Sequence, residues 1–199
     1  TANWQGAEIG PGSVGKPLPL TEIEIVDVET GERVLAVGEQ GEVRARGPQV
    51  MSGYRDRAAE TAATLRGDWL YTGDIGELDA DGNLTIRDRK KDMVITGGEN
   101  VSSIEVEDVL FSHPAVSEVA VIGVPSEKWG ETIKALVVLA PGEQVTEAEL
   151  IAWCKDKAAG YKAPTSIEFR DELARTATGK LQKFKLRAPY WEGRDRQVN

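Results

Sequence analysis

A lysine near the C-terminal end of the chain, Lys180, follows a Thr-Gly pair in the stretch TATGKLQKFKLR. A surface lysine is costly to deprotonate, so it is a poor base. Its compact positive charge instead suits the negative charge that develops during attack on an acyl or phosphoryl group. Thr178 and Gly179 predict a mobile backbone here. If a moving domain brought the lysine to a site, it would act there as an electrostatic clamp. An ordinary surface lysine fits the same residues, and the pattern alone leaves both interpretations open.

A second candidate is Asp74, which ends the stretch Tyr71-Thr72-Gly73-Asp74 at the close of an expected strand. A carboxylate in a turn can accept two hydrogen bonds from vicinal hydroxyls such as those of a ribose. Arg89 is a candidate partner for the same sugar or for a phosphate. Taken alone, Thr-Gly-Asp is more often a plain turn, and an arginine beside lysines is more often a solvated one.

Two adjacent glycines, Gly97 and Gly98, follow an apolar run in DRKKDMVITGGEN. Glycines in this position permit a positive φ or the close approach of a ligand to the backbone. They serve a strand-to-helix turn equally well for structural reasons alone. Trp129, in PSEKWGE, has a flat ring that stacks on another ring or covers a loop.

The first part of the chain, residues 1–89, reads mostly as strand and turn. Apolar residues alternate with polar ones in TEIEIV and GEVRARG, and Asp81-Gly82 marks the turn of a hairpin. One helix interrupts this pattern, with Asp56 as its expected N-cap. Short strands with glycine-rich turns predict a small β-barrel-like or sandwich unit.

The second part, residues 90–199, mixes helices and strands. Capping boxes at Ser102–Glu105 and Thr146–Glu149 predict two helices, and VSEVAVIGV, IKALVVL and SIEF predict strands. The sequence therefore predicts an α+β protein with a β-rich part followed by a compact α+β domain. The charged boundary Arg87–Lys91 favours a short hinge over a flexible tether.

Composition narrows the class of protein. The 199 residues are 40% hydrophobic and 29% charged, as is usual for a soluble globular protein. The formal net charge of −9 argues against nucleic acid as a partner. No apolar run is long enough for a transmembrane segment. The single cysteine, Cys154, fits a core position in a reducing, cytoplasmic environment.

Four stretches together carry a resemblance that none carries alone: GEVRARGPQVMSGY, YTGD, DRKKDMVITGGENV and RTATGKLQKFKLR. In residue types, order and spacing, these stretches resemble those in the C-terminal portion of acyl-CoA synthetases. The superfamily of these enzymes also includes luciferases and the adenylation domains of nonribosomal peptide synthetases. PGSVGKPLP and YKAP match as well, so the resemblance covers essentially the whole chain.

The resemblance implies a reaction in two steps. A carboxylate attacks ATP to give an acyl-adenylate and pyrophosphate, and coenzyme A then displaces AMP to give a thioester. By this resemblance Asp74 binds both ribose hydroxyls, and Arg89 supports the ribose or a phosphate. Lys180 is the adenylation lysine, which meets the α-phosphate and the carboxylate. Lys91 is the hinge about which the C-terminal domain turns.

The resemblance also assigns the glycine turn and the cofactors. Gly97, Gly98 and Glu99 are expected on the face presented for thioester formation, beside the pantetheine channel. ATP, coenzyme A and Mg²⁺ are implied, with the Mg²⁺ ligands, the phosphate loop and the acyl pocket upstream of Thr1. The chain opens on Thr1 and not on Met, so we expect a fragment that is nearly inactive alone.

The implied organisation places residues 1–89 at the end of a large AMP-binding domain and residues 90–199 in a mobile C-terminal lid domain. The missing N-terminal domain of the same chain would then be a partner of this piece. Apolar surface that faces such a domain favours self-association into a homo-oligomer.

The chain departs from the family pattern at two places. Ala174 stands where a proline usually precedes the arginine of the lysine motif, and Ser102 and Ser103 replace a common aromatic and proline. Three alternatives stay open beside a fatty-acid–CoA ligase. These are an aryl-acid–CoA ligase, an adenylation domain that loads a carrier protein, and a non-catalytic binding module that keeps the fold alone.

Overall fold

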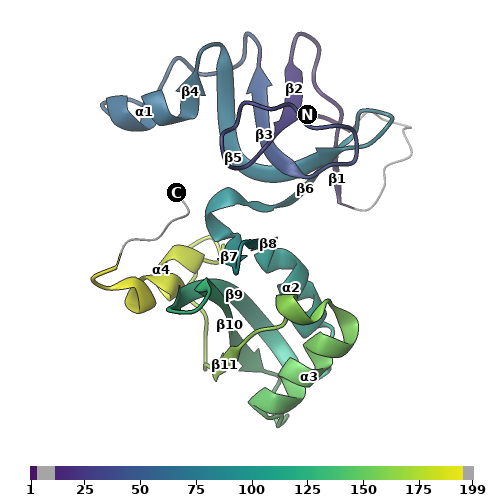
Figure 1. The fold of residues 1–199 in the computed structure, drawn as a ribbon, viewed down its shortest axis with the longest axis vertical. Coiled ribbons are helices and arrows are strands. Elements are labelled where there is room, and N and C mark those ends of the chain that lie inside the picture. Colours follow the sequence, from purple (N-terminus) through teal and green to yellow (C-terminus); the bar gives the residue numbers. More distant parts are fainter. Residues whose placement is uncertain (4–11, 195–199) are drawn as a thin grey trace. The chain divides into compact units, whose positions relative to one another are not determined.

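The computed structural model describes residues 1–3 and 12–194, and the N-terminal residues 4–11, which we expected to form a loop, lie outside these ranges. The chain divides into two compact units, Thr1–Lys90 and Lys91–Asn199. Each unit has its own sheet (Figure 1) and its own hydrophobic core, so each is described by itself.

The first unit is built on one antiparallel sheet in the order β1-β6-β5-β3-β2, with β4 paired to β5. Apolar side chains at alternate positions give the sheet one buried face, where Ile25, Val43 and Leu84 form the core. The elements are β1 (Ser13–Gly15), β2 (Glu22–Val26), β3 (Gly41–Arg46), α1 (Ala58–Thr64), β4 (Leu65–Arg66), β5 (Trp69–Leu78) and β6 (Leu84–Arg89).

This sheet is open, so the α+β class is confirmed while the barrel-like shape predicted for the first part is wrong. In the described part of the chain, β1 and β2 end the strand order and do not pair with each other. A barrel closes only when its two edge strands meet along a shared length. β1 has three residues, and the outer side of β2 instead receives a hydrogen bond from Leu35 N to Ile25 O.

The hairpin of the first unit follows the prediction, but the start of its helix does not. β5 and β6 pair from Leu78 opposite Leu84, and Gly82 takes a positive φ of 78° in the connecting turn. The N-cap of α1 is Arg57, which makes no side-chain cap hydrogen bond. Asp56 has a φ of 57°, whereas an N-cap needs a β-region backbone, so the expected Asp56 cap is wrong.

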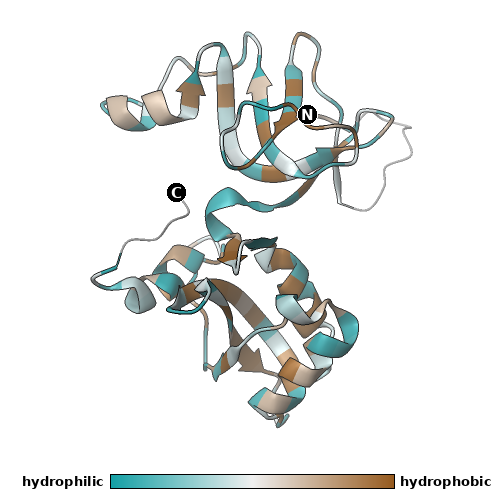
Figure 2. Ribbon diagram, viewed as in Figure 1, coloured by the Kyte–Doolittle hydropathy of each residue, from teal (hydrophilic) through white to brown (hydrophobic). Residues whose placement is uncertain are grey.

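The second unit is a sheet with helices on both faces. β10 pairs in parallel with β11 and antiparallel with β9 and β7, and β7 pairs with β8. Figure 2 shows apolar residues along the central strands. The elements are η1 (Lys90–Asp92), β7 (Val94–Thr96), β8 (Glu99–Val101), α2 (Ser103–Phe111), β9 (Val116–Ser126), β10 (Gly130–Leu139), α3 (Glu147–Lys157), η2 (Gly160–Lys162), β11 (Ser166–Phe169), α4 (Lys183–Arg187) and η3 (Ala188–Trp191).

Alternation along β9 and β10 divides the core of this unit in two. Val121 and Val137 face the side covered by α2 and α3, where Leu110 and Leu150 are fully buried. Ile122 and Leu136 face the other side, against the segment that contains α4. A strand buried on both faces reads as an unbroken apolar run, which explains the sequences AVIGV and ALVVL.

Both predicted capping sites start helices. The Thr146 hydroxyl accepts from Glu149 N, and the Glu149 carboxylate accepts from Thr146 N, which completes a capping box at α3. At α2 the Ser102 hydroxyl accepts from Glu105 N at 3.4 Å. Cys154 on α3 is fully buried, as predicted for a core residue, and this burial raises the pKa of its thiol.

Candidate active-site residues of the two units

The strand pair β5–β6 brings Asp74 and Arg89 together in the first unit. The two residues lie directly opposite each other in the ladder, and Arg89 Nε is 2.7 Å from Asp74 Oδ1. Thr72 fixes the approach to Asp74, because its hydroxyl accepts from Asp74 N and donates to Val43 O. A partly exposed carboxylate beside an exposed guanidinium can bind hydroxyls and an anion at one place.

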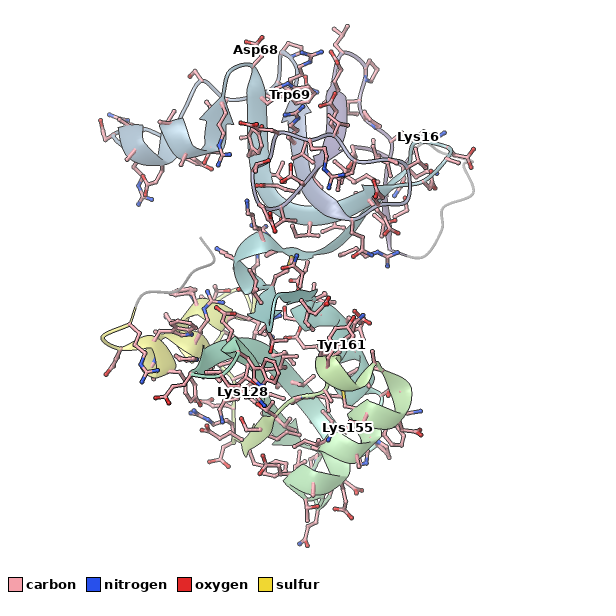
Figure 3. All side chains as sticks on the ribbon, viewed as in Figure 1. Lys16, Asp68, Trp69, Lys128, Lys155 and Tyr161 are labelled. Carbon is pink, nitrogen blue, oxygen red and sulfur yellow. The ribbon has the colours of Figure 1, made fainter. Side chains whose placement is uncertain are left out.

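Aromatic and cationic side chains hold the start of β5 in place. The Tyr71 hydroxyl donates to Gly31 O at 2.8 Å and accepts from Arg44 Nη1 at 3.0 Å. The Arg44 guanidinium lies 4.5 Å from the ring centre of Trp69 (Trp69 is labelled in Figure 3). Burial alone would lower the pKa of Arg44, but its hydrogen bonds to Glu24 and Tyr71 raise it overall. The strand that carries Asp74 is therefore braced three residues before the carboxylate.

Lys91 is the first residue of the second unit, and the boundary between the units falls immediately before it. It lies in the short 3-10 turn η1, with an exposed side chain, and not inside a long helix. A single 3-10 turn has few hydrogen bonds to break when its backbone angles change, unlike a long helix.

Gly97 and Gly98 form the two-residue turn between β7 and β8, where Thr96 pairs with Glu99. Their φ angles are 60° and 87°, so both residues need the left-handed region that glycine enters without cost. Gly97 N also donates to Trp129 O at 3.1 Å. A Cβ on Gly97 would lie 2.9 Å from Trp129 Cε3, whereas one on Gly98 would meet nothing within 4 Å. Gly97 therefore lets the turn lie flat against the Trp129 ring.

A cavity of about 550 Å³ opens beside this turn within the second unit. The rings of Trp129 and Tyr161 are both about half exposed, and Lys155 comes from α3 (Tyr161 and Lys155 are labelled in Figure 3). Within the described ranges the Lys155 ammonium has no hydrogen bond or ion pair. The cavity is lined by Thr96, Gly97, Glu99, Trp129, Thr132, Ile151, Lys155, Gly160, Tyr161, Ala163, Pro164 and Thr165.

The sequence did not reveal Lys155 and Tyr161 as members of this site. The turn that contains Gly97 lies far from α3 along the chain, and tertiary folding brings both to the lining of one cavity. Tyr161 belongs to the YKAP stretch, which carried the resemblance but had no role assigned to it. No periodic pattern marks a pocket built from one hairpin, one helix end and one loop.

The loop that presents Lys180 is closed by hydrogen bonds, and the mobility of its backbone stays a prediction. Arg175 and Leu181 form an isolated bridge at its base. Thr176 N donates to Lys180 O at 2.8 Å, and the Thr176 hydroxyl accepts from Lys180 N at 3.0 Å. Gly179 supplies the turn with a φ of 84°. The side chain of Lys180 is exposed and has no ion pair within residues 12–194.

The next lysine of the same basic stretch has the opposite environment. Lys183 Nζ lies 2.7 Å from Glu107 Oε1 and donates to Ser103 Oγ at 2.7 Å. The side chains of Lys183 and Glu107 are only 11% and 15% exposed. Glu107 Oε1 also accepts from Val121 N at 2.6 Å. This buried pair ties the start of α4 to α2 and β9, directly after the Lys180 loop.

Replacing Lys183 with methionine should lower the free energy of unfolding of the second unit by about 3 kcal/mol, because the Glu107 carboxylate loses its cation while still buried. Lys185→Met is the matched control, since Lys185 is exposed on the same short helix. Urea unfolding of the chain measures the free energy of unfolding of both variants. Equal losses in the two variants would show that the buried pair contributes nothing beyond a surface lysine.

The Lys180 loop and the glycine turn belong to different faces of the second unit. Leu181, next to Lys180, packs into the core on the α4 side of the sheet. Ile151 and Ala163, which line the cavity beside Gly97, pack into the core on the α2 and α3 side. The unit therefore presents the exposed Lys180 on one side and a cavity walled by the glycine turn on the other.

The described residues hold no cluster of three or more histidine, cysteine, aspartate or glutamate side chains suited to a metal ion. None of their helices is both long and apolar enough to span a bilayer.

Comparison with known proteins gives matches along nearly the whole chain. Residues 1–55 match the family described as AMP-binding enzyme, and residues 105–180 match the AMP-binding enzyme C-terminal domain. A long-chain-fatty-acid–CoA ligase of Bacillus subtilis is 46% identical over 93% of this chain and 33% of its own length. A feruloyl-CoA synthase of Amycolatopsis is 45% identical over 88% of this chain and 35% of its own length.

The solved structures agree with the sequence matches. The crystal structure of ATP-bound MatB from Rhodopseudomonas palustris matches with a TM-score of 0.87 and 38% identity, over 94% of this chain and 37% of that one. The chain thus spans about a third of the length of the curated relatives that it matches. With a family match in each unit and relatives at 45% and 46% identity, the chain belongs to the AMP-binding enzymes and contains their C-terminal domain.

Proposed function

We propose that this chain is the C-terminal part of an ATP-dependent acid–CoA ligase, which forms an acyl-adenylate and then an acyl-CoA thioester. The observation that carries the proposal is the placement of two candidate sites on different faces of the second unit. One face presents the Lys180 ammonium, which has no ion pair among the described residues, and the other presents the Gly97 turn and its cavity. Two successive reactions at one acyl group need these two environments in turn.

In the first step a carboxylate oxygen attacks the α-phosphorus of ATP, and pyrophosphate leaves. Asp74 accepts hydrogen bonds from the ribose hydroxyls, while Arg89, 2.7 Å from that carboxylate, supports the ribose or a phosphate. Lys180 supplies a positive charge where negative charge gathers on the phosphate and the carboxylate. Its ammonium has no partner within the described residues to give up first. Mg²⁺ would neutralise the phosphates, and we expect its ligands outside this chain.

In the second step the thiol sulfur of coenzyme A attacks the acyl carbon, and AMP leaves. Gly97, Gly98 and Glu99 form the wall past which the pantetheine arm reaches that carbon. The neighbouring cavity, at about 550 Å³, lies within the size range of small-molecule sites. Its Trp129 ring suits a flat base, and Lys155 suits a phosphate of the same ligand.

Changing from one step to the other requires the second unit to present first one face and then the other. Lys91, at the boundary between the units, is the proposed hinge. The Lys180 loop and the glycine turn then serve one reaction centre at different times, and this motion gates the overall rate.

We favour a fatty acid as the substrate. The supporting relative is the Bacillus subtilis long-chain-fatty-acid–CoA ligase, while the feruloyl-CoA synthase keeps an aryl acid as the second candidate. We expect the acyl pocket in an N-terminal domain, which is the proposed partner of this chain in a cytoplasmic enzyme that could form a homo-oligomer.

The proposal is tested with the complete protein, ATP and a panel of fatty and aryl acids. We expect acid-dependent release of pyrophosphate, followed by thioester formation with free coenzyme A. A preference for a holo-carrier protein over free coenzyme A would move the assignment to a carrier-loading adenylation domain. Absence of acid-dependent pyrophosphate release with every acid would contradict the ligase assignment, and the 199-residue chain alone should be nearly inactive.

A further inference from the structure

The last residue of the first unit is fixed to its own sheet by a buried ion pair. Lys90 Nζ lies 2.8 Å from Glu42 Oε2, and the two side chains are 20% and 5% exposed. Glu42 stands in β3, opposite Ile75 on one side and Val26 on the other. Arg89, just before Lys90, is still in the β5–β6 ladder. Backbone and side chain therefore hold the chain to the first unit up to the Cα of Lys90.

The first residues of the second unit are fixed to that unit in turn. Arg187 Nη1 donates to Lys91 O at 3.0 Å and lies 3.1 Å from Asp92 Oδ1. The side chains of Arg187 and Asp92 are 12% and 14% exposed. Met93 and Val94 follow as buried core residues. From the Lys91 carbonyl onward, the chain belongs to the second unit.

Between these two attachments lies the single 3-10 turn η1. Peptide bonds are planar, so a pivot here changes ψ of Lys90 and φ and ψ of Lys91 and must break the i→i+3 hydrogen bonding of that turn. Hinges in proteins work by concentrating a large change of backbone angle in a few residues. Breaking a buried ion pair is costly because it leaves an uncompensated charge in the interior, so each pair resists release of its segment.

We propose that Glu42 with Lys90, and Arg187 with Asp92, are positioning residues that confine the pivot to the link between Lys90 and Lys91. The inference rests on the proposed function, in which the second unit turns about Lys91. It explains a further feature of the basic stretch that follows Lys180. Arg187 ends α4, the helix whose first residue is the buried Lys183, so the pivot is attached to the element that also supports the Lys180 loop.

Hydrogen exchange followed by mass spectrometry on the complete protein tests the two attachments separately. Glu42→Gln releases the first attachment and Arg187→Gln releases the second. We expect exchange in the segment 88–94 to accelerate about tenfold in each variant, since opening no longer requires breaking the ion pair. Arg170→Gln is the matched control, because it removes an exposed ion pair with Glu168 elsewhere in the second unit.

Steady-state kinetics of the same variants separates positioning from folding. We expect kcat for thioester formation to fall about tenfold in Glu42→Gln and Arg187→Gln, with KM for ATP within about twofold of wild type. The conservative Arg187→Lys variant, which keeps a cation near Asp92, should recover part of the loss.

Unchanged exchange in segment 88–94, or faster exchange spread evenly over the whole unit, would overturn the inference. A wild-type kcat in both variants, despite faster exchange in segment 88–94, would also overturn the inference. A wild-type protein that forms no acyl-CoA would instead overturn the proposed function, and the exchange data would still decide whether the segment is held from both sides.

Discussion

Replacing Lys180 with alanine in the complete protein should slow acyl-adenylate formation by about 100- to 1,000-fold, the usual effect of removing one charge-stabilising group from a transition state. Conversion of a preformed acyl-adenylate and coenzyme A into thioester should stay within about twofold of wild type, because the lysine has no part in that step. Pyrophosphate release measures the first rate, and single-turnover thioester formation measures the second.

Lys185→Ala is the control for this prediction. Lys185 is exposed, like Lys180, and stands in the same basic stretch. Its replacement by alanine therefore removes the same single positive charge from the same surface. We expect its adenylation rate to remain near that of wild type. A comparable loss in Lys185→Ala would mean that the stretch acts through its overall charge and that Lys180 has no specific role.

Replacing Gly97 with alanine should slow thioester formation at least tenfold and leave adenylation nearly unchanged. The alanine must adopt a φ of 60°, which costs about 1–2 kcal/mol for a residue with a Cβ. Its Cβ would also lie 2.9 Å from Trp129 Cε3, so the ring or the turn must shift at the edge of the proposed coenzyme A site. The rate of thioester formation as a function of coenzyme A concentration measures the effect.

Gly98→Ala separates the two causes. Gly98 has a φ of 87°, but a Cβ there meets nothing within 4 Å. Both variants therefore carry the backbone strain, and only Gly97→Ala displaces Trp129. We expect the larger loss, with a raised KM for coenzyme A, in Gly97→Ala. Equal losses would assign the whole effect to the backbone and remove the argument for a site against the Trp129 ring.

The alternation of apolar residues predicted the strands well, including the two that carry the proposed nucleotide-binding residues. Arg89 lies in the predicted hairpin, but the expected strand end and turn at Asp74 are wrong. β5 continues through Asp74 to Leu78, which extends the hairpin ladder and places Asp74 opposite Arg89. The closure of the sheet could not be predicted in the same way. An open sheet and a barrel use the same alternating strands, and the difference lies in whether the edge strands meet.

The basic stretch after Gly179 shows what the sequence cannot resolve. Lys180, Lys183 and Arg187 look alike in KLQKFKLR, yet the first is exposed, the second is paired inside the unit and the third binds the backbone of Lys91. Their partners, Glu107 and Asp92, are far away in the sequence, and no local pattern connects them. Tertiary packing alone assigns these roles, so only the structure separates the candidate catalytic lysine from its supports.

The most direct test of the two-face account measures both half-reactions in Lys180→Ala and Gly97→Ala of the same complete protein. The account predicts a crossed result: the lysine variant loses adenylation and keeps thioester formation, while the glycine variant does the reverse. If both variants lose both half-reactions to the same extent, one fixed site performs the two steps, and the alternation of two faces about Lys91 is contradicted.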